Sequence, residues 1–371
     1  MKRKVLFVAT VLRGHVLVFH LPYMKWFQEQ GYEVHLCCRN DTPDKDVNVP
    51  YCDRFFELPF ERSPLNRGNL AVYKQLKAII DRENYALIHC NTPVGGMLGR
   101  LCARAARKKG TKVVYTAHGF HFFNGAPLKN WLLFYPAERF LSRYTDLLIT
   151  INGEDYQRAQ RFHAKQTALV NGVGVDLSRF ENLKDRIAAR EELGISQDAP
   201  IVICVGEHST RKNHETVLRT AALLPDVHVL FCGVGEKQEE LETLARELDM
   251  AGRTHFLGFR KDVPTLLAAS DIFMFPSWQE GLPVSQMEAM AAGLPCVVSE
   301  VRGNADLISQ GEGGFLRKPT DVDGFAEDIA LLLGDPALRE SMGQRNREEI
   351  EKYSLEFVLS QMEALYQSQL K

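Results

Sequence analysis

Short apolar runs alternate with amphipathic stretches along the first part of the chain. The runs with the length of a buried strand are residues 4–9, 32–38, 86–90, 112–116 and 146–151. The stretches whose apolar positions recur at helical spacing are residues 16–30, 70–83 and 94–108. This alternation of strand and helix predicts an α/β fold with a doubly wound parallel sheet.

The same rhythm resumes near residue 200. The predicted strand-to-loop segments are residues 201–206, 229–235, 257–263, 271–275 and 296–298. A chain of 371 residues is too long for one ordinary core, so two domains are expected. The turn-rich stretch 171–176 reads as a linker. We therefore expect a first domain over residues 1–178, a second over 179–352, and a terminal helical segment, 353–371, that packs back across the domains.

One strand-loop-helix-strand unit, residues 271–298, carries two glutamates with seven residues between them. Glu280 falls in the predicted loop and Glu288 in the predicted helix, which begins near Pro283. In a parallel sheet such a loop lies at the carboxyl end of the strand, where ligands bind. Gly281 allows close backbone approach, and the first helical N–H groups suit an anion. Alternatively, Glu288 is a solvated helix residue and Glu280 merely caps the helix.

Charge divides unevenly between the two predicted domains. Residues 1–178 hold 25 basic and 15 acidic side chains, an excess of ten positive charges, and the remainder holds 20 basic and 32 acidic ones. A basic half suggests an anionic partner. The sequence has no signature of nucleic-acid binding, which leaves an anionic membrane surface or a lipid-linked phosphate as the anionic partner.

The aromatic stretch 125–144, with Trp131, Phe134, Tyr135 and Phe140, is either an interfacial surface or, for most of its rings, core.

Cysteines and the beginning of the chain bear on the compartment. The eight cysteines form no Cys-x-x-Cys pair and no Cys/His cluster in the sequence, so neither a zinc site nor a disulfide framework is predicted. They are expected to be core residues of a reducing compartment. The basic start and short apolar run of residues 1–10 predict a first strand rather than a signal peptide, and no stretch has the length of a membrane span. A cytoplasmic protein, at most at the inner face of the membrane, is expected.

Three further loops carry candidate chemistry. Gly14 follows the first predicted strand, where backbone N–H groups can approach a phosphate or a sugar. His118 follows another strand end, where it can hydrogen-bond a sugar or handle a proton, although a lone histidine is more often satisfied by backbone. Arg211 and Lys212 follow a strand that ends in Gly206, and cations there suit a diphosphate.

Taken together, these motifs resemble the retaining glycosyltransferases of family 4, and the likeness extends from the first strand to the final helix. Its most specific part is the Glu-x7-Glu pattern of Glu280 and Glu288, supported by His118, Lys212 and the linker 171–176. The resemblance implies a GT-B architecture, in which two Rossmann-like domains face each other across a cleft. It also implies transfer of a sugar from a nucleotide-sugar, most simply a UDP-sugar, to a lipid-linked or saccharide acceptor of surface polysaccharide biosynthesis. Members of the family need no cofactor and no metal.

The resemblance also implies residue roles. His118 and Glu280 would be catalytic, with Glu280 holding sugar hydroxyls and Glu288 the ribose. The donor-binding residues would be Gly14, Arg211, Lys212, Phe259, Arg260, Gly281, Leu282, Pro283, Val284 and Glu288.

One departure and two rival functions accompany this interpretation. Glu207 stands where the family commonly has an arginine, and Arg211 is the candidate to replace that cation. A nucleotide-sugar epimerase would share the fold, and a non-catalytic sugar-binding protein could descend from it. An NAD-dependent oxidoreductase is disfavoured because the Gly233-x-Gly235 loop lacks the third glycine of a dinucleotide fingerprint.

Overall fold

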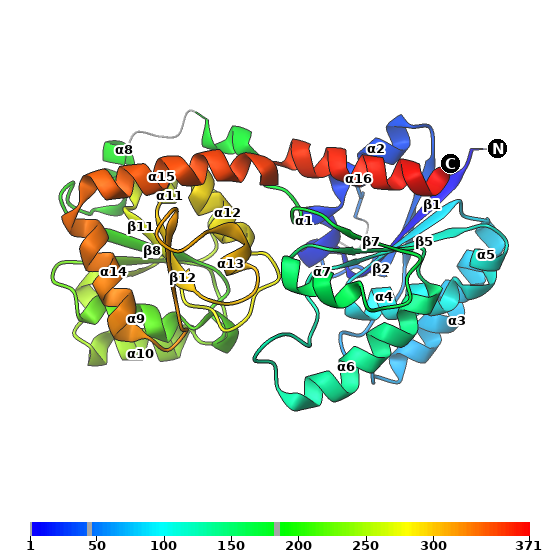
Figure 1. Ribbon diagram of the computed structural model, residues 1–371, viewed down its shortest axis with the longest axis horizontal. Coiled ribbons are helices and arrows are strands. Elements are labelled where there is room, and N and C mark those ends of the chain that lie inside the picture. Colours follow the sequence, from blue (N-terminus) through cyan, green and yellow to red (C-terminus); the bar gives the residue numbers. More distant parts are fainter. Residues whose placement is uncertain (1, 43–46, 182–185) are drawn as a thin grey trace. The chain divides into compact units, whose positions relative to one another are not determined.

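The computed structural model describes residues 2–42, 47–181 and 186–371, and it divides the chain into two compact units. The first unit comprises residues 1–173 and returns for residues 358–371, whereas the second is the continuous stretch 174–357. The chain therefore leaves the first unit five residues before the boundary expected at residue 178. Each unit is built around its own parallel sheet (Figure 1).

The first unit contains a seven-stranded sheet in the order β3-β2-β1-β4-β5-β6-β7, as far as the described residues show. Its strands are β1 (Lys4–Val11), β2 (Glu33–Arg39), β3 (Arg54–Glu57), β4 (Leu87–Asn91), β5 (Lys112–Ala117), β6 (Leu147–Thr150) and β7 (Gln166–Leu169). Every neighbouring pair is parallel, so all carboxyl ends lie at one edge. The strand order reverses between β1 and β4, which is where ligands bind in such sheets.

Alternate residues of β1 enter two separate cores, one on each face of the sheet. Leu6 and Val8 belong to one apolar cluster, and Val5 and Phe7 belong to the other. A strand covered on both faces has to be apolar throughout, which explains the uninterrupted run that the sequence shows. Helices accordingly lie on both sides of this sheet (Figure 1).

The helices of the first unit mostly follow the predicted spans, with two interruptions. The expected helix over 16–30 breaks at His20, and the one over 94–108 breaks at Ala103. Strands β3 and β7 and helix α7 were not predicted, because their segments are short. The helical elements are η1 (Leu12–Val16, a π-helix), α1 (Leu17–Phe19), α2 (Leu21–Glu29), α3 (Gly68–Glu83), α4 (Pro93–Cys102), α5 (Arg104–Lys108), α6 (Leu128–Leu141), η2 (Ser142–Tyr144) and α7 (Gly153–Ala159).

Helix α6 carries the aromatic stretch, and most of its rings pack against the core, which is one of the two interpretations that the sequence left open. Trp131, Phe134 and Tyr135 are partly buried against the core. Phe140 and Leu132 are instead 47% and 70% exposed. The helix therefore has an apolar outer face as well as an inner one.

The last helix, α16 (Leu355–Leu370), completes one core of the first unit. Tyr366 is fully buried, stacks on Trp26 at 5.7 Å between ring centroids, and contacts Phe27 at 4.7 Å. Its hydroxyl lies 2.8 Å from Nδ1 of His89 in β4. The apolar spacing of the terminal segment is thus explained by burial against this sheet.

The second unit contains a six-stranded parallel sheet in the order β10-β9-β8-β11-β12-β13, again within the described residues. Its strands are β8 (Ile201–Val205), β9 (His228–Cys232), β10 (Thr254–Phe256), β11 (Ile272–Phe275), β12 (Cys296–Ser299) and β13 (Gly314–Arg317). Its order reverses between β8 and β11. The loops after these two strands therefore hold the natural ligand position.

Helices cover both faces of this second sheet as well (Figure 1). The helical elements are η3 (Leu177–Phe180), α8 (Arg186–Leu193), η4 (Thr210–Lys212), α9 (His214–Ala222), α10 (Gln238–Glu247), η5 (Ala251–Arg253), α11 (Val263–Ala269), α12 (Val284–Ala291), α13 (Asn304–Leu307), α14 (Val322–Gly334), α15 (Pro336–Ile350) and η6 (Glu351–Tyr353).

Two expectations about the whole chain can be compared with the structure. None of the helices formed by the described residues is both long and apolar enough to span a bilayer. All eight cysteines are unpaired, and all but Cys52 are buried, in agreement with their assignment to the core.

Candidate functional site

Glu280 and two cations meet at the point where the second sheet reverses its strand order. Oε1 of Glu280 accepts a hydrogen bond from Nζ of Lys212 at 2.8 Å and another from Nη1 of Arg211 at 3.0 Å. Glu280 and Lys212 are buried, whereas the Arg211 side chain is 44% exposed. We call these three residues the Glu280 cluster. The structure thus joins residues that the sequence placed in two motifs almost seventy positions apart.

The backbone around η4 explains why Lys212 points inward. The next residue, Asn213, adopts a left-handed conformation (φ 56°), which asparagine tolerates better than most residues. Its side-chain amide donates to the carbonyls of Pro276 and Pro319, both at 2.9 Å. This anchors the turn between β8 and α9, and the Lys212 ammonium lies 4.4 Å from the centre of the Phe275 ring at the end of β11.

Burial dominates the protonation of Lys212. It lowers the pKa of the ammonium below its ordinary value, the Glu280 carboxylate raises the pKa, and Arg211 lowers it. A buried cation of this kind needs an anionic partner, because an unpaired one would lose its hydration without compensation. Glu280 is that partner in the absence of ligand, and a phosphate group offers the same charge complementarity.

The loop from Glu280 to α12 brings backbone groups beside the cluster. Leu282 and Pro283 are buried, Gly281 and Val284 are partly buried, and α12 begins directly after Pro283. The first N–H groups of this helix have no carbonyl partner within it, so they can receive an anion. The donor-binding role expected of this loop stays a prediction.

Two residues behind this loop were missed by the sequence reasoning. Nε of Arg302 donates to the backbone carbonyl of Glu280 at 3.0 Å. Gly303 has φ 86°, and a Cβ there would lie 2.6 Å from the carbonyl oxygen of Gly281. Only glycine fits at that position. The sequence signal that could have identified these two residues is their place in the loop after β12, because β12 lies next to β11 in the sheet.

Glu288 has a partner that the sequence did not suggest. Its carboxylate accepts a hydrogen bond at 2.8 Å from Nη1 of Arg179, a residue of η3. Burial raises the pKa of Glu288, and Arg179 opposes that effect. The alternative that Glu288 is merely a solvated helix residue is wrong, since its side chain is only 12% exposed.

The proposed base-binding residues lie after β10, and the strand ends earlier than expected. Phe259 is 72% exposed, and the Arg260 guanidinium forms an ion pair with Asp262. Gly258 accepts a hydrogen bond through its carbonyl from Gly233 N at 2.9 Å, which ties this loop to the one after β9. An exposed ring and a fixed guanidinium suit stacking against a base.

Two glycines after β9 allow the backbone of that loop to lie close to the backbone of the loop after β8. A Cβ at Gly233 would lie 1.9 Å from the carbonyl oxygen of Gly206, and one at Gly235 would lie 2.3 Å from that of His208. The loops after β8 and β9 therefore approach too closely for any side chain. Glu207, the departure from the family pattern, is exposed beside them and takes no part in the Glu280 cluster.

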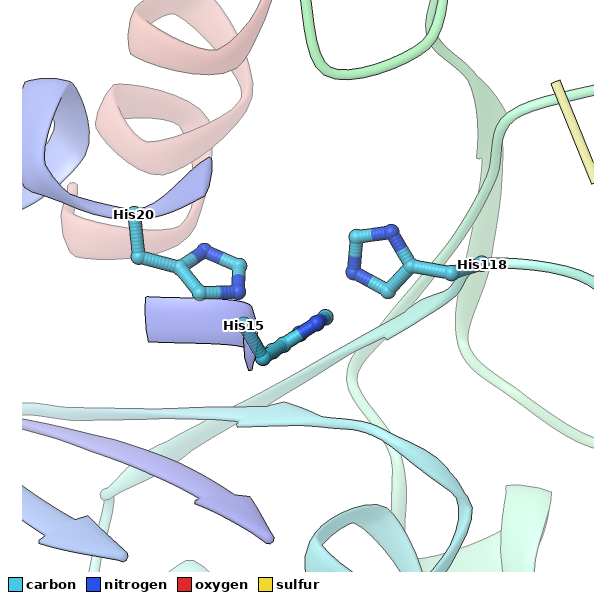
Figure 2. Close-up of side chains that lie close together, drawn as sticks. All are labelled: His15, His20 and His118. Atoms are coloured by element: carbon cyan, nitrogen blue, oxygen red, sulfur yellow. The ribbon is translucent and has the colours of Figure 1, made fainter. Parts of the chain in front are cut away.

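In the first unit, three histidines converge at the carboxyl ends of β1 and β5 (Figure 2). His15 lies in η1, His20 at the junction of α1 and α2, and His118 directly after β5. One ring nitrogen from each lies within 4.8 Å of those of the other two. We call these residues the histidine cluster. The sequence spacing gave no signal of this cluster, because the fold assembles it from residues distant in sequence, and it contains no cysteine.

Burial keeps the histidine cluster neutral near pH 7. It lowers the pKa of His118 to about 4 and that of His15 and His20 well below the ordinary value, and the neighbouring rings lower the latter two further. Nε2 of His118 is buried, and none of the residues that the structure describes supplies it with a hydrogen-bond partner. The ordinary alternative for this residue, a histidine satisfied by backbone, therefore does not hold at that atom.

Gly14 is the remaining sequence candidate of the first unit. Gly14 lies inside η1, and a Cβ there would make ordinary contacts of 3.8 Å or more, so its position does not itself require glycine.

Comparison with known proteins agrees with both units. Residues 185–349 match the family model "Glycosyl transferases group 1", and residues 4–152 match "Glycosyl transferase 4-like". The chain is 41% identical to the "Putative glycosyltransferase EpsD" of Bacillus subtilis (strain 168), over 99% of this chain and 97% of that one. It is 28% identical to the "UDP-Gal:alpha-D-GlcNAc-diphosphoundecaprenol alpha-1,3-galactosyltransferase" of Escherichia coli, over 83% and 82%.

A solved structure matches the fold over the whole chain. Anabaena Alr3699/HepE, in complex with UDP and glucose, superposes with a TM-score of 0.82 at 20% identity and covers 99% of this chain and 100% of its own. That likeness supports the GT-B fold, and the identity to EpsD over nearly the full length establishes the family. The chain belongs to the group 1 glycosyltransferases, family 4.

Proposed function

We propose that this chain is a retaining glycosyltransferase that moves a sugar from a UDP-sugar to a lipid-linked or saccharide acceptor in surface polysaccharide biosynthesis. The observation that carries the proposal is the Glu280 cluster, where two cations contact one carboxylate at the sheet's switch point, in the loop that leads into helix α12. The Escherichia coli relative, whose name specifies UDP-Gal and a diphosphoundecaprenol acceptor, supports this choice of donor and acceptor.

The cluster suits a departing diphosphate. Lys212 is held in place by burial, while the more exposed Arg211 can leave Glu280 and turn toward a phosphate. These two cations and the first N–H groups of α12 would stabilise the leaving charge without a metal. Glu280 would then hold sugar hydroxyls through charge-assisted hydrogen bonds, and Glu288 would hold the ribose.

The remaining roles follow from the same assignment. His118, with its unpartnered Nε2, would hydrogen-bond a hydroxyl of the sugar. None of the carboxylates in the candidate motifs is placed as a nucleophile. A front-side path, in which the leaving phosphate accepts the proton of the acceptor hydroxyl, therefore fits the residues best.

A panel of nucleotide-sugars tests the donor. UDP-, GDP- and ADP-sugars should be compared for protection of the intact chain against thermal unfolding, because a ligand that binds the native state raises its stability. We expect UDP-sugars to raise the unfolding temperature most. Protection by GDP- or ADP-sugars alone would overturn the proposed donor. Product analysis with and without a saccharide acceptor then separates transfer from epimerisation.

The outer face of α6 supports contact with the membrane that holds a lipid-linked acceptor. Leu128 and Leu132 are 72% and 70% exposed. Lys129, Arg139 and Arg143 are also exposed, and none of them forms an ion pair with a described residue. An apolar helix face flanked by unpaired cations suits the interface of an anionic bilayer.

Vesicle sedimentation tests this contact. Each exposed cation contributes roughly 1 kcal/mol at an anionic surface. The attraction decays over a Debye length of about 10 Å at 0.1 M salt. The intact protein should sediment with anionic vesicles at low salt and dissociate at high salt. Leu132→Ser should weaken binding, whereas Leu331→Ser, which changes an exposed leucine of α14, should not. Equal binding to neutral vesicles, or equal effects of the two variants, would contradict the proposal.

A further inference from the structure

The histidine cluster has the composition and spacing of a metal site. The ring centroids of His15 lie 4.7 Å from those of His20 and His118, and the latter two lie 5.9 Å apart. Zn–N bonds of 2.0–2.1 Å in a tetrahedral site place ligand nitrogens about 3.3 Å apart. Nitrogens within 4.8 Å of one another need only small rotations of the side chains to reach that spacing. Figure 2 shows the three rings directed toward one another.

The nitrogens of the cluster are buried without partners. Nε2 of His15, both ring nitrogens of His20 and Nε2 of His118 have no hydrogen-bond partner among the described residues. Unpaired buried polar atoms are uncommon because they lose their hydration without compensation, and several that face one another indicate a missing ligand. His89, the fourth histidine nearby, differs, because Thr116 and Tyr366 occupy its two nitrogens.

The backbone that carries two of the three residues is irregular. His15 lies in the π-helix η1, and His20 lies where α1 stops and α2 begins. Single π-helical turns are rare and occur frequently at functional sites. This irregular backbone places the His15 and His20 rings beside that of His118.

We propose that the histidine cluster binds one divalent transition-metal ion of the zinc class. Neutral imidazole nitrogens are ligands for zinc and cobalt. Three histidines leave a fourth position for water or an anion, the arrangement of an open rather than a closed site. The sequence motifs do not assign such a site, and the family resemblance implies no metal in the reaction.

The ion would act as an inhibitor rather than as a cofactor. If His118 contacts the sugar, as the proposed function holds, a metal bound to its Nε2 denies that atom to the substrate. This consequence rests on the proposed function, whereas binding of the ion does not.

Metal binding is tested on the intact chain after removal of metals with a chelator. Cobalt(II) should bind with one ion per chain and develop the visible absorption of a tetrahedral site, and zinc should displace it and raise the unfolding temperature. His15→Ala should lower the affinity for cobalt and for zinc by at least about 100-fold. This loss exceeds the 10- to 100-fold loss of metal affinity that is typical of a change in an outer-shell residue. His163→Ala, which removes an exposed histidine of the same unit outside the cluster, should leave both affinities unchanged.

The possible outcomes divide clearly. Absence of a tetrahedral cobalt spectrum in the folded wild-type protein overturns the proposal, as does unchanged binding in both His15→Ala and His20→Ala, which would locate the ion at cysteines. If one variant fails to fold, the other carries the test. Cobalt binding without inhibition of transfer would retain the metal site and reject the role of His118 in the proposed function.

Discussion

Glu280→Gln is expected to lower the turnover number about 100- to 1000-fold. The glutamine amide keeps the shape of the side chain but loses the charge that would hold the donor's hydroxyls, and it faces Lys212 and Arg211 with a neutral oxygen. Loss of one charge-directed contact in a closed site costs about 2–4 kcal/mol of transition-state stabilisation. Steady-state kinetics with the best donor of the nucleotide-sugar panel measures the effect.

A matched control separates this effect from a general loss of charge. Glu215→Gln removes an exposed carboxylate of the same unit, one that pairs with Arg219 on the surface of α9. It should leave turnover unchanged. Thermal unfolding of both variants confirms that the fold is intact, which matters because Lys212 loses its charged partner in Glu280→Gln. Near-normal turnover in a folded Glu280→Gln protein would remove Glu280 from the proposed mechanism.

Lys212→Ala is expected to weaken the nucleoside diphosphate and the nucleotide-sugar together, each by about 10- to 100-fold. Both ligands contain the diphosphate that the ammonium would contact, and a hydrogen bond to a charged group contributes about 1.5–3 kcal/mol. Calorimetric titration of the two ligands measures the two affinities independently of turnover.

Two other cations of the second unit, Lys237 and Arg211, provide the comparisons for Lys212→Ala. Lys237→Ala removes a lysine of the same unit that pairs with Glu240, and it should leave both affinities unchanged. Arg211→Ala should have a smaller effect than Lys212→Ala, because its side chain is half exposed. Unchanged diphosphate affinity in Lys212→Ala, combined with its loss in Arg211→Ala, would transfer the assignment to Arg211.

Most of the helices and strands could be predicted, because the pattern that identifies each of them lies within one short stretch of sequence. Both faces of β1 are buried, so its uninterrupted apolar run identifies a central strand of a parallel sheet. Pro283 before α12 and Gly293 after it mark the ends of that helix. The short strands β3 and β7 lie at the two edges of their sheet and give too few residues for a pattern.

The site was predictable only where one motif contains it. The Glu280 loop has a local pattern, but the pairing of Glu288 with Arg179 joins residues 109 positions apart and follows from packing alone. Convergence of His15 with His118 likewise depends on the strand order, in which β4 separates β1 from β5. On α6, the composition of the aromatic stretch did not tell which apolar positions would remain uncovered.

Tyr366 and its neighbours on α16 also determine when the first unit can mature during synthesis. That unit lacks part of one core until residues 358–371 are available, whereas the second unit is continuous in sequence. The ribosome therefore releases a complete second unit before the first can close around Trp26 and Phe27. A nascent or prematurely terminated chain presents those rings to chaperones and proteases. Loss of the final helix would consequently damage the portion of the protein translated earliest.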